Sequence, residues 1–501
     1  MIMNIRHCLM LAWLVAGLQV FSAGQNAPPQ DPSAQEAPSQ GAPSNPSSGD
    51  AGVSSATSIV VADRTAPAAA ASGIAGMPGQ GGDPDPATAL PQIPALLGGK
   101  GVSLAFPSEL ERSNYLRGGL NLSAAYNDNP LLDASGSTGD ASVSIYPNLS
   151  LEQSSSRMRW TLAYAGGVTL NQRYTSQDQE SQNLHFDSDY RLSPHVNLRI
   201  AENFSLTTGY FDAGNGIDVV AGTGGPNASL ITPLATQRSS LTTVETNYHF
   251  ALNDVLGASG SFYDLNFSNV PAGTELTDSE TASGAAFWLH RIFRGDWAGA
   301  SYRFDRIAFT GGETRVHSFF AVNTLDLSHR FTLTAFAGPQ CSDNQSVAGT
   351  IGSAQATQSN DWSLAGGVQG GWQNRRTSIS AGYSRSISDG GGVLGAVRLQ
   401  NVYGNFRRQL IPGWAAALTA SHGTNQSIIV PPASSASSIN LTSAGFTVER
   451  NVGKRVGFVF GYSHDFQEQF FAPTASPQTL NASRNRFFVT LSYQWAKPLG
   501  M

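Results

Sequence analysis

The chain has 501 residues and a formal net charge of −6, and only 13% of its residues are charged, against roughly 25% in an average soluble protein. Its mean hydropathy of −0.16 shows that polar residues have replaced the missing charges, and Gly alone contributes 53 residues. Beyond residue 25 the chain has no apolar run of about 18 residues, which excludes a bundle of transmembrane helices, and its acidic balance gives no electrostatic footprint for nucleic acid.

Residues 1–23 are predicted to be a secretory signal peptide. Arg6 supplies the positive start, the stretch from Leu9 to Phe21 is apolar, and the small residues that follow it provide a cleavage site. A permanent membrane anchor is the alternative, and it is disfavoured because the apolar stretch is short for a membrane span. Removal of the signal leaves Cys341 as the sole cysteine, so we expect no internal disulfide in the exported chain.

Residues 24–107 differ in composition from the rest of the chain. They are rich in Pro, Ala, Gly, Ser and Gln, they hold half of the 26 prolines, and their six acidic and two basic residues sum to −4. This composition cannot bury enough apolar surface to offset the entropy of ordering, so we predict a disordered periplasmic segment. An unspecific spacer and an arm that binds periplasmic partners are both consistent with it.

From about residue 110 to residue 501 the sequence alternates between apolar and polar residues, which is typical of strands with one apolar face. In 160–170, for example, Trp, Leu, Tyr, Gly, Val and Leu occupy the even positions. About eighteen such segments occur. In chain order they are 115–126, 141–153, 157–172, 183–192, 195–210, 238–252, 255–268, 280–292, 296–310, 314–327, 330–341, 359–373, 376–388, 396–410, 413–426, 438–450, 455–467 and 484–495.

The connections between these segments alternate between short and long. Turns of two or three residues are predicted near 155, 194, 254, 295, 329, 375, 412 and 454, and longer polar loops such as 211–237, 342–358, 427–437 and 468–483 lie between them. One rim of short turns and one rim of long loops is the pattern of a bacterial outer-membrane barrel with periplasmic turns. We therefore predict an all-β fold, a transmembrane antiparallel up-and-down β-barrel of about 18 strands, or of 16 if one weak pair is misread.

A soluble β-sandwich would show the same alternation, and three features disfavour it. The predicted strands have 10–16 residues, whereas sandwich strands usually have about 5–6. Each apolar face is matched by a face of Gly, Ser, Thr, Asn and Arg, which suits a watery lumen. Aromatic residues near strand ends suit the interfacial girdles of a membrane barrel. These residues are Tyr126, Trp160, Tyr190, Tyr210, Trp297, Trp372, Trp414 and Trp495.

This pattern resembles the bacterial outer-membrane β-barrel superfamily, in particular its porin-like members, over residues 110–501. The resemblance implies a location in the outer membrane, contact with its lipid, and a final strand that the barrel-assembly machinery reads. The residues that match such a terminal strand are Phe487, Val489, Leu491, Tyr493 and Trp495. The sequence departs from the usual pattern in its tail, 496–501, which places the last aromatic residue away from the chain end.

Tight catalytic and metal-binding motifs are missing, so we predict no catalytic residue, no metal site and no cofactor. The triplet Gly390–Gly392 has no following helix or Lys and is expected to be a flexible loop. His185 shares the polar face of its segment with Asp187 and Asp189, at a spacing that favours a polar ladder over an acid–base site. His464 and Asp465 are neighbours in sequence and are therefore expected to face opposite ways.

Charged residues on polar positions are expected to line the lumen of the barrel. These candidates are Arg159, Asp187, Asp189, Arg199, Glu245, Arg303 and Asp305. Rings of charge set the ion preference of pores, but neither sign dominates here, and pairing across the lumen would serve structure instead.

Barrels of 16–18 strands enclose an aqueous channel, so the leading hypothesis is a porin-like channel for passive passage of small hydrophilic solutes. The second hypothesis is an export conduit, for example for an exopolysaccharide, which works with periplasmic partners through residues 24–107. A barrel anchor or barrel enzyme is the third. Nothing in the sequence marks a homo-oligomer interface.

Overall fold

The computed structural model describes residues 114–130, 138–175, 178–212, 231–270, 276–293, 295–328, 330–348, 355–428, 436–453, 455–471 and 478–499. The predicted signal peptide (1–23) and the predicted disordered segment (24–107) lie outside these residues. In the described part, no helix is long and apolar enough to cross a membrane.

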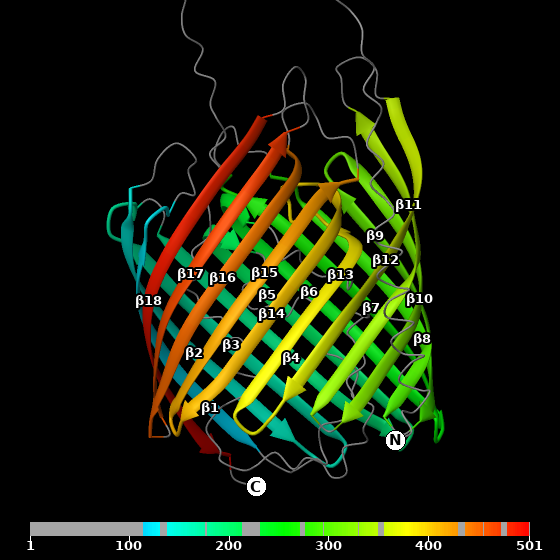
Figure 1. Ribbon diagram of the computed structural model, residues 1–501, viewed down its shortest axis with the longest axis horizontal. Coiled ribbons are helices and arrows are strands. Elements are labelled where there is room, and N and C mark those ends of the chain that lie inside the picture. Colours follow the sequence, from blue (N-terminus) through cyan, green and yellow to red (C-terminus); the bar gives the residue numbers. More distant parts are fainter. Residues whose placement is uncertain are drawn as a thin grey trace, which may run out of the picture. The chain divides into compact units, whose positions relative to one another are not determined.

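Eighteen antiparallel strands form one closed barrel (Figure 1). They are β1 (Tyr115–Asn127), β2 (Asp140–Ser154), β3 (Met158–Asn171), β4 (Gln179–Ser193), β5 (Val196–Asp212), β6 (Ile231–Ala251), β7 (Asp254–Ser268), β8 (Ser279–Phe293), β9 (Asp296–Phe309), β10 (Gly312–Ser328), β11 (Phe331–Ala348), β12 (Gln355–Gln373), β13 (Thr377–Asp389), β14 (Ala396–Ile411), β15 (Trp414–Ser427), β16 (Ala436–Val452), β17 (Val456–Phe471) and β18 (Gln478–Pro498). Each strand pairs with the next in sequence, and β18 pairs with β1 from Tyr115↔Pro498 to Asn127↔Arg486. The prediction of an 18-strand barrel is confirmed, and the 16-strand reading is wrong.

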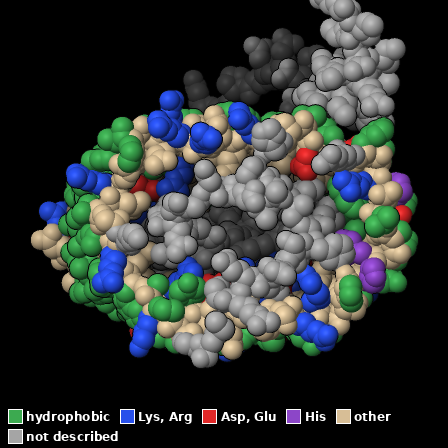
Figure 2. Space-filling view, turned by 90° about the horizontal axis from the view of Figure 1, so that it is seen from below, with side chains coloured by type: hydrophobic (Ala, Val, Ile, Leu, Met, Phe, Trp, Pro, Cys, Tyr) green, Lys and Arg blue, Asp and Glu red, His purple; other side chains and the backbone are tan. Residues whose placement is uncertain are grey.

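The two faces of each strand differ in polarity because successive side chains point to opposite sides of the wall. On β2, for example, Val143, Ile145 and Leu149 are exposed on the outside, whereas Ser142 and Ser144 are buried on the inside. Seen from the rim of short turns, apolar side chains surround the outside of the ring (Figure 2). The barrel is thus apolar outside and mainly polar inside, as a wall between lipid and water requires.

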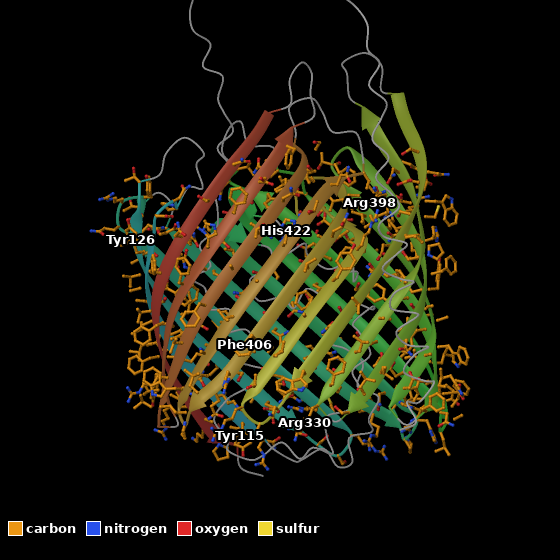
Figure 3. The ribbon with its side chains drawn as sticks, viewed as in Figure 1. Tyr115, Tyr126, Arg330, Arg398, Phe406 and His422 are labelled. Atoms are coloured by element: carbon orange, nitrogen blue, oxygen red, sulfur yellow. The ribbon has the colours of Figure 1, made fainter. Side chains whose placement is uncertain are left out.

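One rim carries connections of two or three residues, such as 194–195 between β4 and β5 and 374–376 between β12 and β13. Tyr115 and Arg330 lie at this rim (Figure 3), which is the periplasmic side in barrels of this kind. The opposite, outer rim carries the longer connections, with one exception. β9 and β10 are joined there by Thr310–Gly311 alone, and Gly311 adopts φ +100, a conformation that favours glycine. The predicted strict alternation of connection length is therefore wrong at this hairpin.

Several strands extend further toward the outer rim than the sequence predicted. β6 begins at Ile231 rather than 238, and β18 begins at Gln478 rather than 484. In these extensions the sequence lacks the alternation of apolar and polar residues that marks a strand. Backbone pairing continues there without a hydrophobic signal.

Candidate functional site

The lumen wall carries most of its charge as ion pairs. The largest group is centred on Arg199 of β5, whose Nη2 lies 2.5 Å from Oδ2 of Asp187 on β4. Its Nε lies 3.9 Å from Oδ1 of Asp189, and its Nη1 lies 3.7 Å from Oε2 of Glu245 on β6. Three carboxylates therefore converge on one guanidinium. The arrangement follows from the register, because Asp189, Arg199 and Glu245 are directly opposite one another on three adjacent strands.

A second pair lies on β9, where Arg303 and Asp305 are two residues apart and so share the inner face. Nη2 of Arg303 lies 2.7 Å from Oδ1 of Asp305, and both side chains are buried. The hydroxyl of Ser283 on β8 also donates a hydrogen bond to Oδ1 of Asp305, at 2.6 Å. This carboxylate is held by two partners within the wall.

A third inner pair was not predicted from the sequence. Nη2 of Arg484 on β18 lies 2.7 Å from Oδ2 of Asp465 on β17, and both side chains are only 1% exposed. Asp465 and Arg484 are directly opposite in the register, and the hydroxyl of Ser443 on β16 donates a second hydrogen bond to Asp465 at 2.7 Å. The alternation of β17 and β18 places both residues on the inside, but only the register shows that they meet.

Near the periplasmic rim, Nη2 of Arg159 lies 2.6 Å from Oε1 of Glu152, and this arginine side chain is 51% exposed. Arg117 approaches the same carboxylate at 3.4 Å. Arg159 and the other six candidate lumen residues all lie on the face of their strand that is opposite to the exposed apolar side chains. Whether they set an ion preference stays a prediction.

The histidines singled out in the sequence contact amides. Nδ1 of His185 lies 2.6 Å from Oδ1 of Asn203, while its neighbour Asp187 is engaged by Arg199. His464 points outward and lies 2.9 Å from Asn485, whereas Asp465 points inward, so the expected opposite orientation of these two residues is confirmed. Among the described residues no group of His, Cys, Asp or Glu is arranged to hold a metal ion.

The prediction that Trp297 belongs to the aromatic girdle is wrong, because this side chain faces the lumen rather than lipid. It is buried in an inner apolar cluster on β7–β10 and β12. The members of this cluster are Val255, Phe287, Leu289, Trp297, Phe320, Val322 and Ala365, with Ala285 and Phe336 packed against them. The position of Trp297 near a strand end suggested a girdle, but its odd position on β9 matches Arg303 and Asp305 on the inner face. The cluster forms an apolar sector of the inner wall.

The prediction of a flexible loop at Gly390–Gly392 is wrong, because this segment is packed against the inner wall. The end of β13 and the start of β14 form a hairpin tip whose residues 386–397 are nearly all buried. Ile387 and Ala396 pack against Ile307 of β9 and Val316 of β10. We call residues 386–397 the inner hairpin.

Polar contacts fix the same hairpin to other parts of the wall. The hydroxyl of Ser279 on β8 donates a hydrogen bond to Oδ2 of Asp389 at 3.0 Å, and the amide of Thr277 donates to the carbonyl of Gly392 at 2.9 Å. On another side, Leu394 packs against Ile439 of β16. The inner hairpin thus contacts β8 and β16, which are well separated around the ring, and so it narrows the outer half of the lumen.

One carboxylate lies on the outer face within the apolar sequence of β5. Glu202 shares its parity with the exposed Ile200, and the outer face continues with Phe204. The hydroxyl of Ser240 donates a hydrogen bond to Oε1 of Glu202 at 2.7 Å, and the hydroxyl of Thr242 donates to Oε2. A charge at this position is unfavourable in lipid, and the two donors offset part of that cost.

The last strand closes the barrel with its aromatic face outward. Phe487, Val489 and Tyr493 are exposed, and Leu491 and Trp495 share their parity. The structure thus places all five candidate assembly residues on the outer face of β18, beside β1. Recognition of this strand by the assembly machinery stays a prediction.

A closed ring of eighteen strands with an apolar outer face, aromatic side chains such as Tyr190, Trp288 and Tyr126 on that face, and a polar inner face requires a bilayer around it (Figure 3). The chain is a closed 18-strand antiparallel β-barrel with an apolar outer face. The barrel is similar to several solved structures at low identity. OccK2 (OpdF) from Pseudomonas aeruginosa is 11% identical, with 77% of this chain and 98% of that chain covered and a TM-score of 0.40.

OpdQ from Pseudomonas aeruginosa is 10% identical over 77% of this chain and 98% of its own, with a TM-score of 0.38. The siderophore receptor PiuA from Acinetobacter baumannii is 9% identical over 77% of this chain and 82% of its own, with a TM-score of 0.38. No protein-family model and no curated protein matches the chain.

Proposed function

We propose that the protein is a porin-like channel for passive passage of small hydrophilic solutes across the outer membrane. The observation that carries this proposal is the inner face of a closed 18-strand wall, which is lined mainly by Ser, Thr, Asn and Gln and by paired charges. A barrel of this strand number is wide enough to enclose water, in contrast to 8-strand barrels that side chains fill.

The pairing of the charges supports weak ion selectivity. Arg303 and Arg484 each contact one carboxylate within the wall, so their fields are largely compensated, whereas Arg199 is shared by three carboxylates and leaves a local excess of negative charge. A pore that selects strongly for one sign has an excess of that field in its lining. Neutral polar solutes and cations are therefore favoured over anions as the main cargo.

The inner hairpin supports a limit on solute size. It holds a defined position through the contacts of Asp389 with Ser279 and of Leu394 with Ile439, on two distant parts of the wall. A solute that enters from the outer rim must pass beside it. Small molecules are thus favoured over oligomers.

Planar-bilayer recording and liposome swelling test the proposal directly. The purified full chain and a variant without residues 24–107 are expected to give stepwise conductance with a low preference for potassium or chloride. Liposomes that contain the protein are expected to swell in isotonic monosaccharide faster than in a trisaccharide. Heat-modifiable mobility on gels serves as the folding control. A correctly folded barrel that gives neither conductance nor swelling would refute the channel and favour an anchor or a gated exporter.

A further inference from the structure

Exposed arginines gather along one part of the rim of short turns. They lie in or beside the turns that follow β10, β12, β14 and β16. The residues are Arg330, Arg375, Arg376, Arg408, Arg450 and Arg455. Figure 2 shows this rim face on, with many Lys and Arg side chains and few Asp and Glu side chains around it. We call these six residues the basic arc.

Backbone hydrogen bonds show that the four turns are neighbours. The carbonyl of Arg330 accepts a hydrogen bond from the end of β12 at 2.8 Å, and the carbonyl of Arg376 accepts one from the end of β14 at 2.7 Å. The carbonyl of Gly413 accepts one from the end of β16 at 2.8 Å. The basic arc is therefore one continuous surface that spans successive turns.

The basic arc has an excess of positive charge. One carboxylate, Glu449, occurs in the segments that form these turns. The segments are 328–331, 372–377, 407–414 and 449–456. Oε2 of Glu449 lies 2.6 Å from Nη2 of Arg407, on the inner face of the wall. None of the six arginines forms an ion pair with a carboxylate among the described residues. The β6–β7 turn (249–256), in contrast, contains Asp254 and no Lys or Arg.

Two arginines of the basic arc lie on the outer face of the wall. Arg408 is on the same face of β14 as Leu410, which is 49% exposed. Arg450 is on the same face of β16 as Val452, which is 47% exposed. The guanidinium carbon of Arg450 lies 5.0 Å from the centre of the Trp414 ring, in a cation–π contact. Unpaired guanidinium groups and exposed apolar side chains therefore occur side by side at this rim.

An anionic phospholipid has the two kinds of group that this surface fits. Its phosphate oxygens accept hydrogen bonds from the planar guanidinium group, often two at a time, and its acyl chains cover apolar side chains. Arginines at the edge of an apolar surface extend their charged ends toward the headgroup layer. The acidic residues of segment 24–107 would also attract the guanidinium groups, but they give no reason for Arg408 and Arg450 to lie beside exposed apolar residues.

We propose that the basic arc binds the phosphate groups of anionic phospholipids in the membrane leaflet at the rim of short turns. Arg408 and Arg450 contact the lipid from the outer face of the wall, and the arginines of the turns reach the headgroups from the aqueous side. The proposal rests on the membrane location in the proposed function and does not depend on the passage of solutes.

Native mass spectrometry of the full-length protein tests the binding. The protein is freed of lipid in a nonionic detergent and titrated with phosphatidylglycerol or with phosphatidylcholine of the same acyl chains, so that only the headgroup differs. We expect the apparent Kd for phosphatidylglycerol to be about fivefold lower. This factor corresponds to the attraction of one arginine to an anionic headgroup at a membrane surface.

Paired substitutions separate direct contact from overall charge. Arg408→Gln with Arg450→Gln removes two charges from the outer face, and the preference for phosphatidylglycerol is expected to disappear. Arg407→Gln with Arg159→Gln removes two charges from the inner face near the same rim, where both arginines pair with glutamates. This matched control is expected to keep the preference. Heat-modifiable mobility on gels verifies that both variants are folded.

Three results would overturn the proposal. The first is equal affinity of the unmodified protein for the two lipids, or an equal loss of preference in the two paired variants. The second is displacement of phosphatidylglycerol by an equal concentration of inorganic phosphate, which would assign the basic arc to a free anion. The third is a preference that emerges only after residues 24–107 are removed, which would show that the acidic segment occupies the basic arc.

Conductance of the outer-face variant reports the channel separately. Arg408 and Arg450 point away from the lumen, so single-channel conductance in planar bilayers is expected to be unchanged in Arg408→Gln with Arg450→Gln. Failure of lipid binding and failure of the channel are therefore distinct results.

Discussion

Removal of the Arg484 charge is expected to destabilise the barrel far more than removal of an arginine at the rim. Arg484 and Asp465 are each 1% exposed and lie 2.7 Å apart, so Arg484→Met leaves a buried carboxylate with the hydroxyl of Ser443 and without its guanidinium. Loss of one partner of a buried pair costs about 3–5 kcal/mol. Arg159→Met removes a pair of similar length, 2.6 Å, but its arginine is 51% exposed, and the expected cost is about 0–1 kcal/mol.

The measurement is urea-induced unfolding in lipid vesicles, followed by tryptophan fluorescence, with the free energy of unfolding obtained for each variant. The double variant Arg484→Met, Asp465→Leu is expected to recover most of the loss, because it removes the buried carboxylate as well. Equal losses for Arg484→Met and Arg159→Met would refute the reasoning. That result would mean that water screens the inner pair as effectively as the rim pair.

Three further changes test the lumen, the inner hairpin and the outer face. Arg199→Ala removes the cation that three carboxylates share, so the reversal potential in a KCl gradient is expected to shift toward cation preference, and a shift toward anions would contradict the pairing. Gly392→Val places a branched side chain at φ +79 against a phenyl ring, at a cost of about 1–3 kcal/mol, and is expected to displace the inner hairpin and raise single-channel conductance. Unchanged conductance would show that the hairpin does not limit the path. Glu202→Leu combined with Ser240→Val and Thr242→Val is expected to raise the free energy of unfolding by about 1 kcal/mol if lipid covers this face, and a loss of stability would instead indicate that another protein covers it.

The alternation of side chains predicted which residues face the lumen. Parity places Asp187, Arg199 and Asp305 on the inner face, because successive side chains of a strand point to opposite sides of the wall. Parity also places Glu202 on the outer face, although a charged side chain is unfavourable in lipid. The position of Trp297 near a strand end predicts a girdle residue, whereas its parity places it on the inner face, where the structure has it.

The alternation of side chains does not predict contacts between residues that are far apart in the chain. Asp465 and Arg484 meet because β17 and β18 adopt one register, and a shift of that register would separate them without changing either strand's pattern. The contact of Ser279 with Asp389 spans 110 residues and depends on how the inner hairpin bends. Neither contact follows from the sequence of the individual strands.

The sequence by itself predicted a membrane barrel of about 18 strands and, through parity, one inner and one outer face for each strand. Those properties follow from a period of two, repeated eighteen times, and from connections that return the chain to the same rim. Only the tertiary structure decided that the Gly390–Gly392 segment packs inside, which carboxylates the lumen arginines contact, and that the pairing of β12 with β13 ends at Gly366. The reason is physical: alternation acts on each strand separately, whereas pairing, bending and closure depend on strands that meet only after the ring has formed.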